Sequence, residues 1–117
     1  MENIFRGYCR ETGEGVSRID LDGPVVYSAM CGGEGAVYAS VRPEDILLSK
    51  EPVRSSARNC FEGTIVDIVN NGMVVRITVD VGIPFVSILT RQGYQEMDLH
   101  QMDRIFITFK ASSVHVF

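Results

Sequence analysis

The stretch that decides the fold reads Gly63-Thr64-Ile65-Val66-Asp67-Ile68-Val69-Asn70-Asn71-Gly72-Met73-Val74-Val75-Arg76-Ile77-Thr78-Val79. Its Asn-Gly pair is a strong hairpin signal, because both central residues of a type I′ turn need positive φ. On the returning side, apolar Val75, Ile77 and Val79 alternate with polar residues, which is the period of a half-buried strand. The stretch therefore predicts two antiparallel strands joined by a tight turn.

The residues after this hairpin extend the same pattern. Residues 85–89 read as a third strand, and Thr90 is expected to cap a helix of about two turns that carries Tyr94 and Met97 on one side. Residues 103–110 read as another strand with apolar positions inward, and residues 114–116 are expected to close the sheet. About five strands with one short helix fit a small OB-like barrel.

The first half of the chain is punctuated by glycines that separate short strand-like runs. These runs cover residues 15–19, 24–27 and 36–41, with no helical periodicity between them. Turn signals at this spacing are typical of a sandwich or barrel. We therefore expect an all-β protein, with an OB-like barrel over residues 51–117 and a smaller N-terminal β subdomain over residues 1–50.

Composition narrows the class of protein. The chain has 117 residues, of which 45% are hydrophobic and 22% charged, which is ordinary for a soluble globular domain. It has no apolar run of the roughly 20 residues that cross a bilayer and no signal-peptide layout, so we expect a cytoplasmic protein. The net charge of −4 argues against a nucleic-acid backbone as partner, whereas a small anion needs only one or two cations.

The sequence contains no recognisable catalytic motif or metal-binding motif. The three cysteines, Cys9, Cys31 and Cys60, form no CxxC pair and are expected to be reduced and packed as small hydrophobes. The two histidines are remote from them, so no metal site is expected. The chain contains no phosphate-binding Gly-x-x-x-x-Gly-Lys loop and no Gly-x-Ser-x-Gly nucleophile elbow. We therefore expect no catalysis by this chain.

Three polar segments suggest a binding site instead. Residues 55–59 offer two hydroxyls, a guanidinium and an amide; residues 90–93 open a helix whose free N–H groups favour negative charge; residues 110–113 offer an ammonium and two hydroxyls. With the neighbouring Arg54 these segments carry Arg58, Arg91 and Lys110, and none of the three contains an acidic residue, the first after Thr90 being Glu96. Such groups are what a buried tetrahedral oxyanion requires.

The same segments resemble a known family. The matching motifs are Ser56-Ala57-Arg58-Asn59, Gly63-Thr64-Ile65, Thr90-x-x-Gly93 with Met97 and Leu99, and Phe109-Lys110-Ala111-Ser112-x-Val114. In this order they resemble the molybdate-binding (Mop-type, TOBE) domain over about residues 55–116. Residues 2–7 and 41–46 look like the segment that follows the ATPase core in ATP-binding subunits of ABC importers. The whole resembles the C-terminal regulatory domain of a molybdate/tungstate importer ATPase, without the ATPase domain.

The resemblance implies a site and its residues. The positions that it assigns to the oxyanion are Ser56, Ala57, Arg58, Thr90, Gly93, Lys110 and Ala111. Gly93 stands where the family usually has serine, so one hydroxyl donor is missing. The implied ligand is molybdate or tungstate, with no cofactor and no metal ion other than the one inside the oxyanion.

The resemblance also implies partners and a role. It implies a homodimer or higher oligomer through the barrel, with the anion between barrels, and the ATPase and membrane subunits of an ABC importer as partners, at the cytoplasmic side of the membrane. Anion binding would then inhibit uptake by feedback (trans-inhibition). Two alternatives stay open. One is a TOBE-like domain that only dimerises or regulates another importer and binds no oxyanion. The other is an OB-type nucleic-acid-binding module.

Overall fold

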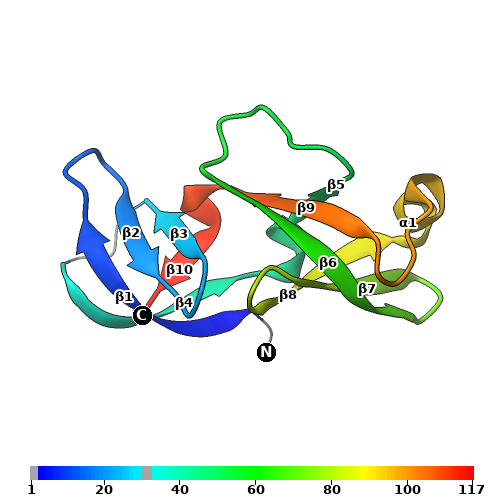
Figure 1. Ribbon diagram of the computed structural model, residues 1–117, viewed down its shortest axis with the longest axis horizontal. Coiled ribbons are helices and arrows are strands. Elements are labelled where there is room, and N and C mark those ends of the chain that lie inside the picture. The colour runs from blue at the N-terminus through cyan, green and yellow to red at the C-terminus, as the bar shows by residue number, and fades with distance from the viewer. Residues whose placement is uncertain (1–2, 30–32) are drawn as a thin grey trace.

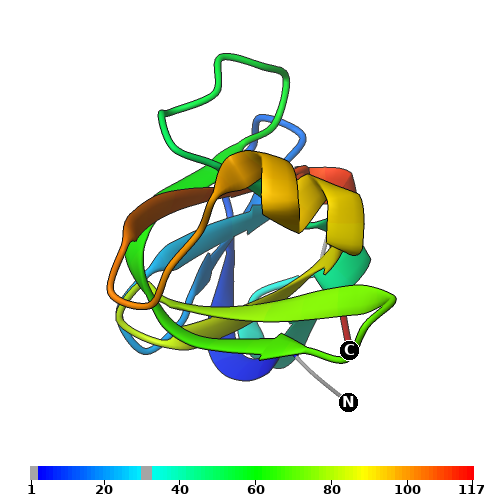
Figure 2. The same cartoon turned by 90° about the vertical axis from the view of Figure 1, so that its right-hand side faces the viewer.

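A computed structural model describes residues 3–29 and 33–117 of the chain. The chain forms two lobes side by side along a longest dimension of 42 Å (Figure 1). Each lobe is built on one five-stranded antiparallel sheet, and strands make up 54% of the described residues. The curled sheets are seen end-on in Figure 2. These features confirm the all-β, OB-like fold with one short helix.

The first sheet has the strand order β10-β4-β1-β2-β3. Its strands are β1 (Ile4–Glu11), β2 (Ser17–Asp20), β3 (Val25–Ser28), β4 (Gly35–Val41) and β10 (Val114–Val116). Four of them lie where the sequence predicted strands. The fifth, β1, was missed as a strand, because the exposed positions Arg6, Tyr8 and Arg10 and the glycine at position 7 weaken its apolar alternation.

The second sheet has the order β5-β9-β6-β7-β8. Its strands are β5 (Leu47–Ser49), β6 (Asn59–Asn70), β7 (Val74–Asp80), β8 (Pro84–Thr90) and β9 (Arg104–Phe109). The β6–β7 hairpin and the buried inward face of β9 confirm the predictions. The one α-helix of the described residues, α1 (Arg91–Met97), follows β8 at the right-hand end of the molecule (Figures 1 and 2).

The two sheets exchange a strand. A 3₁₀ turn, η1 (Pro43–Asp45), carries the chain from β4 of the first sheet to β5 of the second, and η2 (Ala111–Ser113) carries it from β9 back to β10 of the first. The prediction that residues 114–116 close the second sheet is therefore wrong, because β5 already occupies the edge of β9. The division at residues 50 and 51 stays a prediction, although one strand on each side of it pairs with the other side.

The two lobes are structural repeats of each other. Both sheets have the same order when β1, β2, β3, β4 and β10 are matched with β6, β7, β8, β9 and β5. The matched strands β1 and β6 begin with related sequences, Asn3-Ile4-Phe5-Arg6-Gly7 and Asn59-Cys60-Phe61-Glu62-Gly63. One hydrophobic core runs through both lobes. In it the Phe85 ring packs against the rings of Phe5, Phe61 and Phe109, and Phe61 also packs against Phe109, at centroid distances of 4.8–6.5 Å.

Two asparagines hold the lobes together in a reciprocal way. The Asn3 side chain, before β1, donates to the Val86 carbonyl and accepts from the Val86 N–H, both at 2.7 Å. The Asn59 side chain, at the start of β6, accepts from the Tyr27 N–H at 2.7 Å and donates to the Tyr27 carbonyl at 2.9 Å. Each lobe therefore contributes one amide clamp to an edge strand of the other. We refer to them as the Asn3 clamp and the Asn59 clamp.

The cysteines and helices complete the comparison with sequence. Cys9, fully buried in β1, is disulfide-bonded, so the prediction of reduced cysteines is wrong for this residue. Wide spacing of cysteines along the sequence does not exclude their closeness in a folded sheet. Cys60 is free and exposed, and Cys31 lies outside the described residues. Among the residues described, no helix has the length and hydropathy needed to span a bilayer.

Candidate functional site

The main candidate site is a pocket between the linker and the end of β9. The linker, residues 50–58, has no regular secondary structure and rises above the junction of the lobes in Figure 1. Val53, Ser55 and Ala57 of the linker line a pocket of about 390 Å³ together with Lys110 and Ser113. We call it the linker pocket. It unites two of the three polar segments that the sequence singled out.

Local hydrogen bonds shape both walls of this pocket. In the linker, the Ala57 N–H donates to the Ser55 hydroxyl at 3.1 Å, which folds the segment into a small turn. On the other wall, the Ser113 N–H donates to the Lys110 carbonyl at 3.0 Å and forms η2. Lys110 itself is extended (φ −78°, ψ 150°) and exposed, so its ammonium can turn towards a ligand. Ala111 is buried, and its carbonyl accepts from the Ala29 N–H at 3.3 Å.

Other predicted site residues lie elsewhere in this chain. Ser56 is exposed and does not line the linker pocket. Arg58 is also exposed and lines a separate hollow of about 350 Å³, together with Glu14 of the β1–β2 connection and Tyr27. Thr90 is the N-cap of α1 and Gly93 lies in its first turn. This helix is at the opposite end of the second lobe from η2 (Figure 1). Ala111 is buried and does not line the linker pocket either. One copy of the chain therefore brings Ala57 and Lys110 together at this pocket but not the remaining five predicted site residues.

One backbone N–H group at the start of α1 is already bonded to the helix's own cap residue. As predicted, Thr90 is the N-cap, and its hydroxyl accepts from the Gly93 N–H at 3.1 Å. A Cβ added at Gly93 would lie 3.2 Å from that hydroxyl, which is a tight contact. A side chain at position 93 therefore has to share space with the cap.

Sequence reasoning missed two acidic neighbours of the site. Asp45 of η1 lines the linker pocket and forms an ion pair of 3.3 Å with Arg42, and Glu14 lines the hollow of Arg58. In the folded chain the basic residues of the site therefore have acidic neighbours that their own segments of sequence do not contain. No signal in the sequence could place Asp45 beside Lys110, because the strand exchange brings η1 there. The Asn59 amide, expected to face a ligand, is committed to Tyr27 instead.

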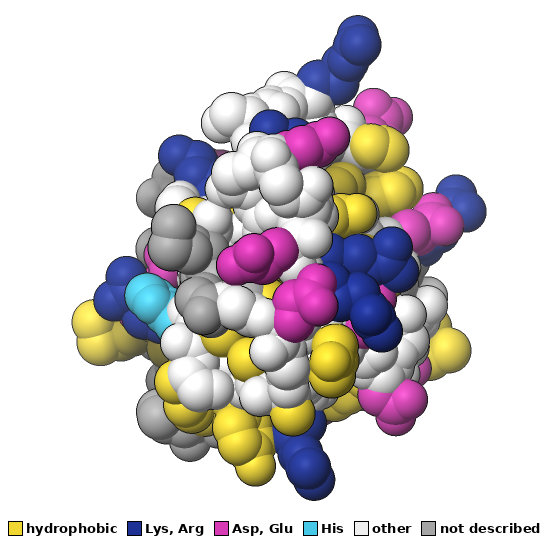
Figure 3. Space-filling view, turned by 90° about the vertical axis from the view of Figure 1, so that its left-hand side faces the viewer, with side chains coloured by type: hydrophobic (Ala, Val, Ile, Leu, Met, Phe, Trp, Pro, Cys, Tyr) yellow, Lys and Arg dark blue, Asp and Glu magenta, His cyan; other side chains and the backbone are white. Residues whose placement is uncertain are grey.

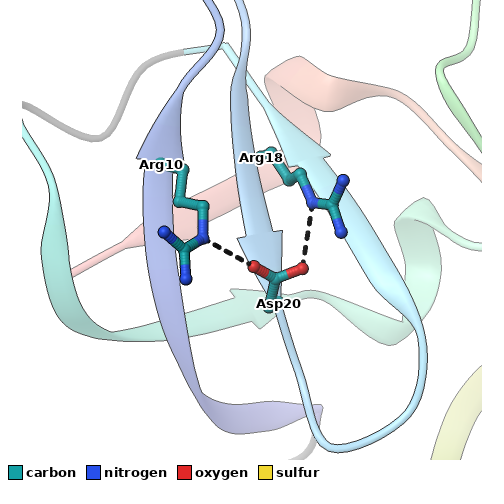
Figure 4. Close-up of polar contacts among 3 residues, drawn as sticks. All are labelled: Arg10, Arg18 and Asp20. Atoms are coloured by element: carbon teal, nitrogen blue, oxygen red, sulfur yellow. Dashed lines mark hydrogen bonds and ion pairs between the residues drawn. The ribbon is translucent and has the colours of Figure 1, made fainter.

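A second charged cluster lies on the outer face of the first sheet. On the left-hand face of the molecule, basic side chains gather beside acidic and hydrophobic ones (Figure 3). Arg10 and Arg18 hold Asp20 from both sides, at 3.2 and 2.9 Å (Figure 4). The hydrogen bond from Arg18, followed by that from Arg10, lowers the pKa of Asp20 below its ordinary value. The mutual pairing satisfies this cluster, and within the described residues no group of His, Cys, Asp and Glu could hold a metal ion.

Two repeated, strand-exchanged OB-like lobes with a pocket beside their junction define a class of small double β-barrel domains. The family model described as "TOBE domain" matches residues 55–116, and the chain belongs to this family. The match begins in the linker and ends in β10, so it includes both walls of the linker pocket.

Curated relatives carry a consistent name. The chain is 39% identical over 85 residues to the molybdate/tungstate import ATP-binding protein WtpC of Pyrococcus abyssi, and 36% identical over 84 residues to the protein of that name from Pyrococcus horikoshii. These matches cover 72% and 71% of this chain but only 25% and 24% of the relatives. The chain thus spans about a quarter of the length of either relative.

A solved structure agrees in fold over nearly the whole chain. It is a crystal structure of the cytoplasmic molybdate-binding protein ModG with molybdate bound. The two structures superpose with a TM-score of 0.81 over 97% of this chain and 94% of the other, at 21% identity. At this identity the likeness establishes the two-lobed fold, including β1 to β4 of the first lobe, which lie outside the family match.

Proposed function

We propose that this chain is a cytoplasmic regulatory domain that binds a tetrahedral oxyanion, molybdate or tungstate, in the linker pocket. The observation that carries the proposal is the meeting of Ser55 and Ala57 with Lys110 and Ser113, which are more than fifty residues away in sequence, around one pocket. Such a pocket offers one ammonium and two hydroxyls. These are the groups that replace the hydration of a doubly charged oxyanion.

The state of Lys110 supports this role. Lys110 is exposed and has no carboxylate partner among the ion pairs of the described residues. Asp45 lines the same pocket, but Arg42 pairs with its carboxylate at 3.3 Å. The positive charge of Lys110 therefore remains available to an anion, while Arg42 offsets the nearest negative charge.

Two copies of the chain complete the proposed site. Arg58, Thr90 and Gly93 lie away from the linker pocket of their own chain, so a partner copy would supply the groups that one copy does not bring together. The anion would then join two regulatory domains. An anion that binds the joined arrangement more tightly shifts the population towards it.

The relatives support the wider role. Two relatives are named as ATP-binding proteins of molybdate/tungstate import, and the neighbour in fold is named as a cytoplasmic molybdate-binding protein. We infer that the domain serves an ABC importer, beside its ATPase and membrane subunits on the cytoplasmic side. Anion-joined domains would hold the ATPase domains apart and reduce uptake by feedback. In this role the chain carries no catalytic group of its own.

The test is a calorimetric titration of the purified chain with molybdate, tungstate and sulfate, alongside sedimentation. We expect about one molybdate or tungstate per chain, at least tenfold weaker binding of sulfate, and a dimer or larger oligomer with the anion present. Lys110→Ala should weaken binding about 10- to 100-fold, because a hydrogen bond to a charged group contributes about 1.5–3 kcal/mol.

The matched control for Lys110→Ala is Lys50→Ala, which removes the same charge from the start of the linker outside the pocket. It should change the affinity less than twofold. Absence of binding at millimolar molybdate and tungstate would favour the alternative of a TOBE domain that only dimerises, for which the Asp45 carboxylate in the pocket is the supporting observation.

A further inference from the structure

The geometry points to Asn59 as a positioning residue for the proposed anion site, and this inference rests on the proposed function. Its side chain is 1% exposed, and both its oxygen and its nitrogen are bonded to Tyr27. The amide therefore does not face an anion. It fixes the place of the groups that do.

Asn59 joins three segments of the site at one point. The linker ends at Arg58, directly before it. Its backbone pairs with Phe109, the last residue of β9, and Lys110 directly follows Phe109 in the chain. Its side chain binds Tyr27 in β3 of the other lobe. A shift of Asn59 therefore moves the linker relative to both neighbours.

The strand that Asn59 holds also holds η2. Two residues after Tyr27, the Ala29 N–H donates to the Ala111 carbonyl at 3.3 Å. The end of β3 thus contacts both Asn59, which directly follows the linker, and Ala111 of η2, which directly follows Lys110. Loss of the clamp would remove this connection and leave only the β6–β9 ladder between the end of the linker and Lys110. A charged ligand is sensitive to small errors in the placement of its donors.

No hydrogen bond between neighbouring strands can replace the Asn59 clamp. β3 is an edge strand of the first sheet, so the outward N–H and carbonyl of Tyr27 have no neighbouring strand. Without the amide these groups have to find water or shift, because unpaired backbone groups away from water are costly. We expect the shift to open the junction next to Arg58.

The Asn3 clamp is a natural control. It has the same two bonds to the edge strand β8, but it lies on the repeat that lacks the linker and Lys110. Asn3 has φ 58°, a conformation that alanine tolerates less well than asparagine, so Asn3→Ala should lose at least as much stability as Asn59→Ala. A loss of affinity caused only by lower stability would therefore appear in both variants.

The experiment compares Asn59→Ala with Asn3→Ala in the complete chain, using thermal unfolding and calorimetric titration with sodium molybdate. We expect both variants to unfold at temperatures several degrees below the unsubstituted chain. Asn59→Ala should bind molybdate at least tenfold more weakly, whereas Asn3→Ala should stay within twofold.

A second pair, Asn59→Gln and Asn3→Gln, covers the case in which an alanine variant does not fold. Glutamine keeps both hydrogen-bonding groups but is longer by one methylene, so it displaces the linker without leaving Tyr27 unpaired. Equal changes of affinity at positions 59 and 3 in the folded pair would overturn the positioning role alone. An unsubstituted chain that binds neither molybdate nor tungstate would overturn the proposed function, and the positioning role with it.

Discussion

The two 3₁₀ turns of the described residues, η1 and η2, have nearly the same backbone and opposite side-chain chemistry. In η1 the Asp45 N–H donates to the Arg42 carbonyl at 2.9 Å, and in η2 the Ser113 N–H donates to the Lys110 carbonyl at 3.0 Å. The residues before the turns, Arg42 and Lys110, have similar angles (φ −67°, ψ 139° and φ −78°, ψ 150°). Both turns also lead into the exchanged strand of their repeat.

The side chains on these matching backbones differ in the ways that matter to an anion. After the basic residue, η1 has Pro-Glu-Asp, whereas η2 has Ala-Ser-Ser. Proline removes a backbone donor, and the two carboxylates repel negative charge. One repeat thus keeps the turn as scaffold while the other carries the groups of the proposed site. Comparing η1 with η2 therefore separates the backbone features that both lobes need to fold from the side chains proposed to bind the anion.

The largest expected effect tests the repeat itself. Gly63→Ala should destabilise the protein by about 2–4 kcal/mol, because the new Cβ would lie 2.5 Å from the Asp80 carbonyl oxygen, which belongs to a rigid strand. The equivalent change Gly7→Ala meets the Ile19 and Leu21 side chains at 2.8 Å and should cost about 1–2 kcal/mol. Urea unfolding of both variants measures the difference. A greater cost at Gly7 would contradict the expectation that the backbone contact at Gly63 is the harder one to relieve.

The next effect tests whether the two turns differ only in chemistry. The double variant Ser112→Glu, Ser113→Asp gives η2 the acidic residues of η1. Since η1 already adopts this backbone with those residues, the fold should persist, as circular dichroism can check. Molybdate binding should weaken at least about 100-fold, because like charges placed together in a site cost several kcal/mol. Retained binding would place the anion away from η2.

A smaller effect concerns the carboxylate inside the linker pocket. Asp45→Asn should tighten molybdate binding about fivefold, since it removes a negative charge from the pocket lining while solvent screens the interaction. Glu44→Gln is the control, because Glu44 is exposed and does not line the pocket, and it should change the affinity less than twofold. Calorimetry at two salt concentrations should show the gain shrinking as salt rises.

The smallest effect tests the start of α1. Gly93→Ser supplies the hydroxyl that the family usually has, and we expect about twofold tighter molybdate binding in the oligomer. The gain is small because the new Cβ would lie 3.2 Å from the Thr90 hydroxyl and has to share the cap. Stability should stay within about 0.5 kcal/mol, since serine favours a helix slightly more than glycine does. An unchanged affinity would remove Gly93 from the proposed site.

Much of the second lobe could be predicted from the sequence, because its signals are local. The hairpin at the Asn-Gly pair, the alternation in β7 and the cap at Thr90 each depend on a few neighbouring residues, and each is confirmed. The type I′ turn is not, because Gly72 has the expected positive φ (98°) and Asn71 does not. What failed depends on distant partners. Residues 114–116 have the same strand pattern whichever sheet they join, and no local rule selects β4 over the second sheet.

The site was predictable in part for the same reason. The polar segments around Ser55 and Lys110 were recognisable by composition, and the structure brings them to one pocket. Asp45 was not recognisable, because it reaches that pocket only through the exchanged strand that follows η1. The commitment of Asn59 to Tyr27 was hidden as well, since an amide in a polar segment looks the same whether it faces a ligand or a backbone.

The exchange of strands also has a consequence for biosynthesis. The outer edge of β4 is completed only by β10, at residues 114–116. A ribosome adds about 5–20 residues per second, so the N-terminal sheet stays open for several seconds after β4 has emerged. During that interval an exposed edge can pair with the β10 segment of a neighbouring nascent chain on the same messenger. Premature pairing of this kind would yield intertwined dimers, and slower translation of the second half would increase their share.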